Sequence, residues 1–246
     1  MLKESVKLHV LGDSFASPGI CVDPSDSFWG LAGQNLKIDK IQNYSHPGFS
    51  LDHVLHILLN ENFNFSTDYF IIGIPPLVRY IGYSDNYNTT WNLTEFDRSF
   101  IQNTQKVNCL SNTQKFTFEQ QFKNDILGVD RFNSEWNDVQ CLEKIFLLHQ
   151  YLKSYNTKFM IVNLSNPIVC QDLWPAGCNI MIQVKQLTEC VIFDNTYYSV
   201  NYQDQIKPAD FNKYGWQGHH GPEGNVNWYN KVIKPKMIEL NWIDNA

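Results

Sequence analysis

Short apolar segments alternate along this chain with longer segments of helical periodicity. The apolar segments are of strand length and end at glycine or at turn residues, at positions 6–12, 37–45, 68–74, 158–165 and 189–194. Apolar residues recur at helical spacing at positions 26–36, 50–61, 137–155 and 223–240. We expect Ser25 or Asp26 to cap the first helix, Ser50 to cap the second, and Pro235 to kink or split the last.

The alternation of strands and helices fixes the fold class. It predicts a parallel sheet with helices on both faces, because each parallel connection has to cross over the sheet. The one long stretch outside this pattern, at about 75–135, is rich in Asn, Gln, Thr and aromatic residues. We interpret residues 1–246 as a single domain that carries this stretch as an insertion or lid.

Charge and composition narrow the class of partner. The net charge of −6 and the absence of a basic stripe argue against nucleic acid. No apolar run approaches the ~20 residues of a membrane span, and MLKESVKLHVLGDS leaves no room for a signal peptide before the first strand. We therefore expect a cytoplasmic protein with reduced cysteines, although Cys170 and Cys178 could bridge a loop.

A serine stands where the first expected strand ends, in the stretch KLHVLGDSFASPG. Ligands of open parallel sheets bind beyond the carboxyl ends of the strands, and Ser14 follows there, after Gly12 and Asp13. A serine in this place can act as a nucleophile while its backbone N–H contributes to an anion site. Asp-Ser after a strand is also common in turns and helix caps, so this stretch alone leaves both interpretations open.

Two further stretches contain the other groups that acyl transfer needs, an oxyanion donor and a general base. NYSHPGFS places Gly48 at the turn before a helix, where its N–H can face an oxyanion. GWQGHHGPEGNVNWY places His219 and His220 just before a glycine-rich turn and the final helix. Serine, glycine and histidine can therefore converge at one edge of the sheet.

Together these stretches resemble the sequence blocks of the SGNH, or GDSL-type, serine hydrolases. The resemblance is greatest to short members of the family from phages and bacteria. VLGDSFA resembles the first block, Gly48 sits at the glycine of the second, and HHGPEGNVNW resembles the last. The resemblance covers nearly the whole chain outside the insertion. It implies a flavodoxin-like three-layer sandwich with a central five-stranded parallel sheet. It also implies a Ser–His hydrolase of acyl or acetyl esters. Because that chemistry is nucleophilic and no ligand-spaced cluster is visible, we expect no metal and no cofactor.

The chain departs from the family's third block. That block is Gly-x-Asn-Asp after the third strand, whereas GIPPLVR places Pro75 where the asparagine would be. Proline has no N–H and no polar side chain, and losing one oxyanion donor typically costs ~100- to 1000-fold in rate. Three side chains are candidates to replace the missing donor: Arg79, Asn163 and Asn166.

The last block also departs, because the family has an aspartate three residues before the histidine. Trp216 stands three before His219, and Gln217 stands three before His220. Gln217 can accept the ring N–H and hold the tautomer, but it cannot stabilise an imidazolium by charge. More distant carboxylates remain candidates, namely Asp204 and Asp210.

Spacing distinguishes the two histidines. The family places its histidine five residues before the turn glycine, which selects His219, five before Gly224. The spacing to Gln217 as a surrogate acid selects His220 instead. We expect His219 to be the base, with His220 as the alternative.

The sequence thus predicts a serine ester hydrolase in which Ser14 attacks a carbonyl and the N–H groups of Ser14 and Gly48 bind the oxyanion. The expected substrate is a small ester or an acylated carbohydrate, with specificity set by the insertion. The alternative is a weakened or inactive binding or structural protein on the same scaffold. The lack of G-x-G-x-x-G after the first strand disfavours a nucleotide binder, and no His/Asp cluster at ligand spacing indicates a metal.

Overall fold

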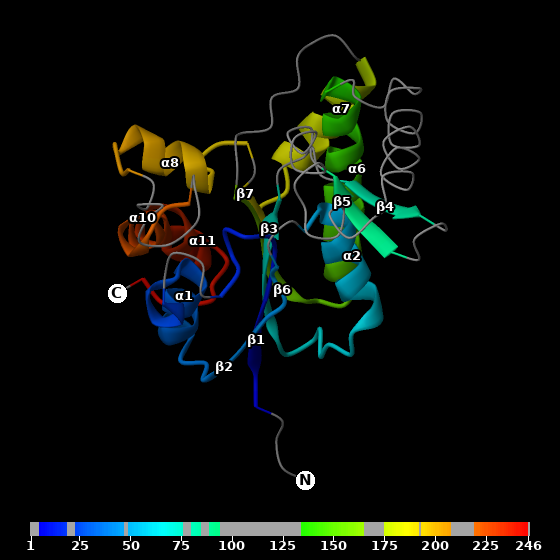
Figure 1. Ribbon diagram of the computed structural model, residues 1–246. Helices are drawn as coiled ribbons and strands as arrows, with labels where there is room; N and C mark the ends of the chain where they lie inside the picture. Colours follow the sequence, from blue (N-terminus) through cyan, green and yellow to red (C-terminus); the bar gives the residue numbers. More distant parts are fainter. Residues whose placement is uncertain are drawn as a thin grey trace, which may run out of the picture.

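A five-stranded sheet organises the computed structural model, which describes residues 5–18, 23–46, 49–75, 80–84, 89–93, 134–164, 175–191, 193–207 and 219–245. Its order is β2-β1-β3-β6-β7, and every pair in it is parallel (Figure 1). The strands are β1 (Lys7–Leu11), β2 (Lys40–Asn43), β3 (Tyr69–Ile74), β6 (Lys158–Asn163) and β7 (Cys190–Val191). This is the flavodoxin-like order. The chain first adds β2 on one side of β1 and then adds β3, β6 and β7 on the other side, so the switch point of the sheet lies between β1 and β3.

Helices cover both faces of the sheet, which confirms the expected α/β three-layer sandwich (Figure 1). Successive side chains of β3 are buried on opposite faces: Ile71 belongs to one apolar cluster and Ile72 to the other. The first cluster packs under α1 (Phe28–Leu36), α10 (Pro222–Trp228), η3 (Tyr229–Ile233) and α11 (Lys234–Glu239). The second packs under α2 (Leu51–Asn60), α6 (Ser134–Ser154) and α7 (Pro175–Lys185).

The first helix begins two residues later than expected. A short 3-10 turn, η1 (Pro24–Asp26), comes first, and α1 starts at Phe28. Ser27, not Ser25 or Asp26, is the N-cap, and its Oγ accepts a hydrogen bond from the Gly30 N–H at 3.0 Å. The expectation for the second helix is met, since Ser50 is the N-cap of α2.

The last helix is split, as Pro235 predicted. The chain runs through α10, a π-helical turn at η3 and then α11, with Pro235 in the first turn of α11. Proline lacks the N–H that would continue the α-helical hydrogen-bond ladder, and the π-helical turn η3 ends two residues before Pro235. The fifth strand, β7, is shorter than expected. Farther along the chain Asn195 takes a left-handed conformation, φ 57°, and Thr196 caps α8 (Tyr197–Gln203).

Two strands and two α-helices were not expected from the sequence. Strands β4 (Tyr80–Ser84) and β5 (Thr89–Leu93) form an antiparallel hairpin within the insertion, and helices α7 and α8 flank β7 in the chain. Cys170, one of the two cysteines that could bridge a loop, lies outside the described residues. Within the described part of the chain, no helix combines the length and apolarity needed to cross a membrane.

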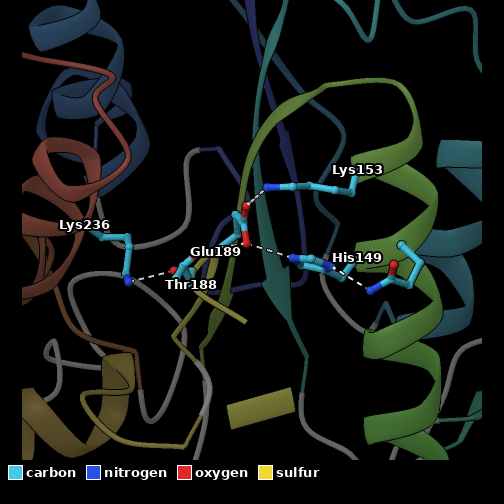
Figure 2. Close-up of polar contacts among 6 residues, drawn as sticks. His149, Lys153, Thr188, Glu189 and Lys236 are labelled. Atoms are coloured by element: carbon cyan, nitrogen blue, oxygen red, sulfur yellow. Dashed lines mark hydrogen bonds and ion pairs between the residues drawn. The ribbon is translucent and has the colours of Figure 1, made fainter. Parts of the chain in front are cut away.

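A buried carboxylate ties α6 to the outermost strand (Figure 2). Glu189 lies just before β7, and its Oε2 is 2.8 Å from His149 Nε2. Its other oxygen, Oε1, pairs with Lys153 Nζ. Thr188 Oγ1 adds a third donor at 3.0 Å, while the Thr188 carbonyl accepts from Lys236 Nζ of α11 at 2.8 Å. Burial alone would raise the pKa of Glu189, but the hydrogen bonds from His149 and Lys153 outweigh it and lower the pKa to about 2.

Candidate active site

Ser14 and His219 meet at the carboxyl end of β1. The two residues are 205 positions apart in the chain, and His219 Nε2 lies 2.8 Å from Ser14 Oγ. This is hydrogen-bond distance between a hydroxyl and an imidazole nitrogen, the arrangement required of a nucleophile and its base. Ser14 is buried, 4% exposed, and β1 borders the switch point of the sheet, where ligands of such folds bind.

The loop after β1 holds Ser14 by a tight turn. The Asp13 carbonyl accepts from the Ala16 N–H at 3.1 Å, and Asp13 Oδ1 accepts from the Phe15 N–H at 3.0 Å. Asp13 thus closes an Asx-type turn around Ser14. From β2, Asn43 Nδ2 donates to the Ala16 carbonyl at 2.7 Å, which ties the loop to the neighbouring strand.

Gly12 serves this loop by its small size. Its φ lies outside the left-handed region, so an unusual backbone conformation is not what selects glycine here. A Cβ at this position would come 3.1 Å from Ala16 Cβ and 3.2 Å from Leu164 Cδ1. The turn therefore approaches the sheet closely, and a side chain at position 12 would need Ala16 and Leu164 to shift by a few tenths of an ångström.

A buried network fixes the backbone that carries His219. The His220 carbonyl accepts from Tyr197 Oη at 3.3 Å, and Asn225 Nδ2 donates to Tyr197 Oη at 3.1 Å. Asn225 Oδ1 in turn accepts from the Phe28 N–H of α1 at 3.2 Å. Neither Tyr197 nor Asn225 was singled out from the sequence, because nothing in DNTYYSVNY or EGNVNW relates those side chains to a distant histidine.

His220 is buried between α8 and α10. Its ring is 3% exposed and lies 5.5 Å from the ring of Tyr197 and 5.9 Å from that of Tyr198, centre to centre. Burial lowers the pKa of His220, and a hydrogen bond with the Ile206 backbone offsets part of that effect. The geometry therefore pairs Ser14 with the histidine that the Gly224 spacing selected.

Gly224 explains that spacing. A Cβ on Gly224 would come 2.3 Å from His220 Cβ and 3.0 Å from His220 Cγ. The first turn of α10 can pass this close to the histidine pair only with glycine at that position.

Several expected site residues lie outside the described residues, and their roles stay predictions: Gly48, Arg79, Asn166, Asp210, Trp216 and Gln217. Asn163 is described. It is buried at the carboxyl end of β6, level with Ile74 and two strands from β1. Asp204 is held elsewhere, by Asn227 Nδ2 at 2.7 Å and Lys231 Nζ at 2.5 Å on the surface.

The described residues contain no group of three or more His, Cys, Asp or Glu side chains placed to hold a metal ion. A buried histidine–aspartate pair joins His9 Nε2 to Asp68 Oδ2 at 2.9 Å. It lies among aromatic rings near the amino ends of β1 and β3, away from Ser14. Burial lowers the pKa of His9, and its hydrogen bond to Asp68 offsets part of that effect.

Comparison with known proteins gives structural matches only. No family model matches the chain, and no curated protein matches it. A member of the lipolytic G-D-S-L family from Veillonella parvula is 13% identical, with a TM-score of 0.43, over 94% of this chain and 97% of that one. Phospholipase A1 from Streptomyces albidoflavus is 13% identical, with a TM-score of 0.43, over 94% and 99%.

A third structure is a carbohydrate esterase whose active site is described as displaying divergent catalytic and non-catalytic binding functions. It is 11% identical, with a TM-score of 0.47, over 99% of this chain and 71% of that one. The structures similar to this chain thus include a member of the lipolytic G-D-S-L family, which is the family that the sequence motifs resemble. The sheet order β2-β1-β3-β6-β7 of the chain itself defines its fold.

Proposed function

We propose that this protein is a serine ester hydrolase in which Ser14 is the nucleophile and His219 is the general base. The observation that supports this most strongly is the 2.8 Å contact between His219 Nε2 and Ser14 Oγ. It joins a loop after β1 to the start of α10, at the end of the sheet where open parallel folds bind their ligands. A buried serine that contacts an imidazole nitrogen in this place has the arrangement of an acyl-transfer nucleophile.

The mechanism has two halves. Ser14 Oγ attacks the carbonyl carbon of the ester, its proton passes to His219 Nε2, and the carbonyl π pair moves onto oxygen. The resulting oxyanion is bound by the backbone N–H groups of Ser14 and Gly48. The imidazolium then gives its proton to the departing alkoxide, which leaves an acyl-enzyme and an alcohol. Water, deprotonated by His219, releases the acid and restores Ser14.

The pH dependence follows from the base. Only neutral His219 can accept the serine proton, so kcat/KM should rise with pH as the imidazolium loses its proton. A small ester or an acylated carbohydrate is the proposed substrate class.

Hydrolysis of p-nitrophenyl acetate by point variants tests the assignment. Ser14→Ala should lower kcat by roughly 1000-fold or more while the protein stays folded. Ser17→Ala is the matched control, because Ser17 is also buried, three residues along the same loop, and it should retain activity. His219→Ala should cost far more activity per folded molecule than His220→Ala. Parent-like rates in Ser14→Ala would refute the proposal, and activity lost only in His220→Ala would reassign the base.

A further inference from the structure

An aromatic ring lies flat against the imidazole that contacts Ser14. The rings of Phe15 and His219 are stacked, with centroids 4.4 Å apart and planes inclined by 24°. Phe15 follows Ser14 directly in the chain, so one short segment contacts His219 twice. The Ser14 hydroxyl meets the edge of the imidazole at Nε2, and the Phe15 ring covers its face.

Phe15 is itself held from two sides. Its backbone N–H donates to Asp13 Oδ1 at 3.0 Å, which fixes the start of the side chain. The Tyr197 ring packs edge-on against it, with centroids 5.6 Å apart and an interplanar angle of 61°. Tyr197 is 1% exposed and is anchored through its hydroxyl to the His220 carbonyl. The orientation of the Phe15 ring is therefore set by buried contacts.

We propose that Phe15 is a positioning residue of this site, which keeps His219 Nε2 aimed at Ser14 Oγ and stabilises the imidazolium that forms when His219 takes the serine proton. This rests on the proposed function, and it adds a role for an aromatic face. A cation within ~6 Å of a ring centroid is attracted to the electron-rich face of the ring. The imidazolium satisfies that distance without any movement of the resting site, and the neutral ring gains less from the same contact.

The titratable groups around this stack come from each segment that packs on it. They are Asp13 on the Ser14 loop, His220 next to His219 in the chain, and Tyr197 on α8. Substitutions at Phe15 leave these three groups in place. A change in the titration of His219 on altering only the electrons of the Phe15 ring can therefore be assigned to the ring.

The test compares three forms of position 15: phenylalanine, pentafluorophenylalanine and leucine (Phe15→Leu). Pentafluorophenylalanine keeps the shape of the ring and reverses its quadrupole, so it isolates the electrostatic part even if Phe15→Leu folds poorly. We measure the pKa of His219 in the resting protein by NMR titration of the imidazole, and kcat and KM for p-nitrophenyl acetate. Phe65→Leu is the control, since Phe65 is also half-buried among aromatic rings but precedes β3 at the other end of the sheet.

Both changes at position 15 should lower the pKa of His219 by about half a unit and lower kcat about two- to fivefold, with KM unchanged. Phe65→Leu should alter neither quantity. An identical His219 pKa in all three forms would overturn the proposal, as would a lowered pKa with unchanged kcat. If the parent protein hydrolyses no ester, the proposed function fails and the role in turnover falls with it. The NMR titration still decides whether the Phe15 ring stabilises the His219 cation.

Discussion

The network around Glu189 leads to a prediction about stability in acid. Glu189→Gln keeps the shape of the side chain and removes its charge, so His149 and Lys153 lose the carboxylate that they share. The pKa of Glu189 lies at about 2, against an ordinary value of 4.5. Each unit is worth about 1.4 kcal/mol of differential stability, which gives an upper value of about 3 kcal/mol at pH 7.

Two features set the size of the expected stability difference between parent and variant and the direction in which it changes with pH. The Lys153 side chain is 59% exposed, so solvent screens its share, and we expect about 2 kcal/mol at pH 7. Because the pKa of Glu189 is depressed in the folded state, its contribution is fully present above its unfolded pKa of about 4.5. It is lost as the pH falls toward 2. The gap between parent and variant should therefore close across that range.

Urea denaturation at a series of pH values between 7 and 3 measures this. The free energy of unfolding of Glu189→Gln should lie about 2 kcal/mol below that of the parent at pH 7, and the two should converge in acid. Glu143→Gln is the matched control, because Glu143 is an exposed glutamate on α6, the helix that carries His149 and Lys153, and it should change stability by less than about 0.5 kcal/mol. A gap at pH 7 no larger than that of the control would refute the reasoning, as would a constant gap at every pH.

Two further predictions concern the site. Gly224→Ala places a Cβ 2.3 Å from His220 Cβ, so it should cost about 1–3 kcal/mol of stability and lower kcat by displacing the adjacent His219. Val226→Ala, half-exposed on the same helix, is the control in urea denaturation and ester hydrolysis, and equal effects of the two changes would contradict the close-approach argument. Treatment with EDTA should leave ester hydrolysis unchanged, because the Ser–His mechanism uses no metal. A rate that collapses with EDTA and returns with zinc or manganese would overturn that mechanism.

The sheet could be predicted from the sequence because strands buried on both faces are short and continuously apolar. β1, β3 and β6 each have this character, and helical periodicity marked α1, α2 and α6. Helices α7 and α8 were missed for physical reasons. α8 has only seven residues, and α7 begins at Pro175 in a stretch with little apolar periodicity. The hairpin of β4 and β5 lies in a polar segment where no alternation signals a buried face.

The contact at the centre of the site could be predicted in part. The spacing from His219 to Gly224 identified the histidine that reaches Ser14, and the 2.3 Å approach at Gly224 gives that spacing a physical cause. The contacts that orient the site could not be predicted from the sequence. The stack of Phe15 on His219 depends on how the β1 loop and α10 meet, which only the folded chain determines.

Covalent labelling with a fluorophosphonate tests the central claim most directly, because the probe reacts with a serine activated by a neighbouring base. Intact mass spectrometry followed by peptide mapping should find one adduct in the parent, on Ser14, and none in Ser14→Ala. Labelling should also slow sharply in His219→Ala and below pH 6, since each removes the neutral base. An adduct on another serine, or equal labelling of the parent and Ser14→Ala, would contradict the assignment of Ser14 as the nucleophile.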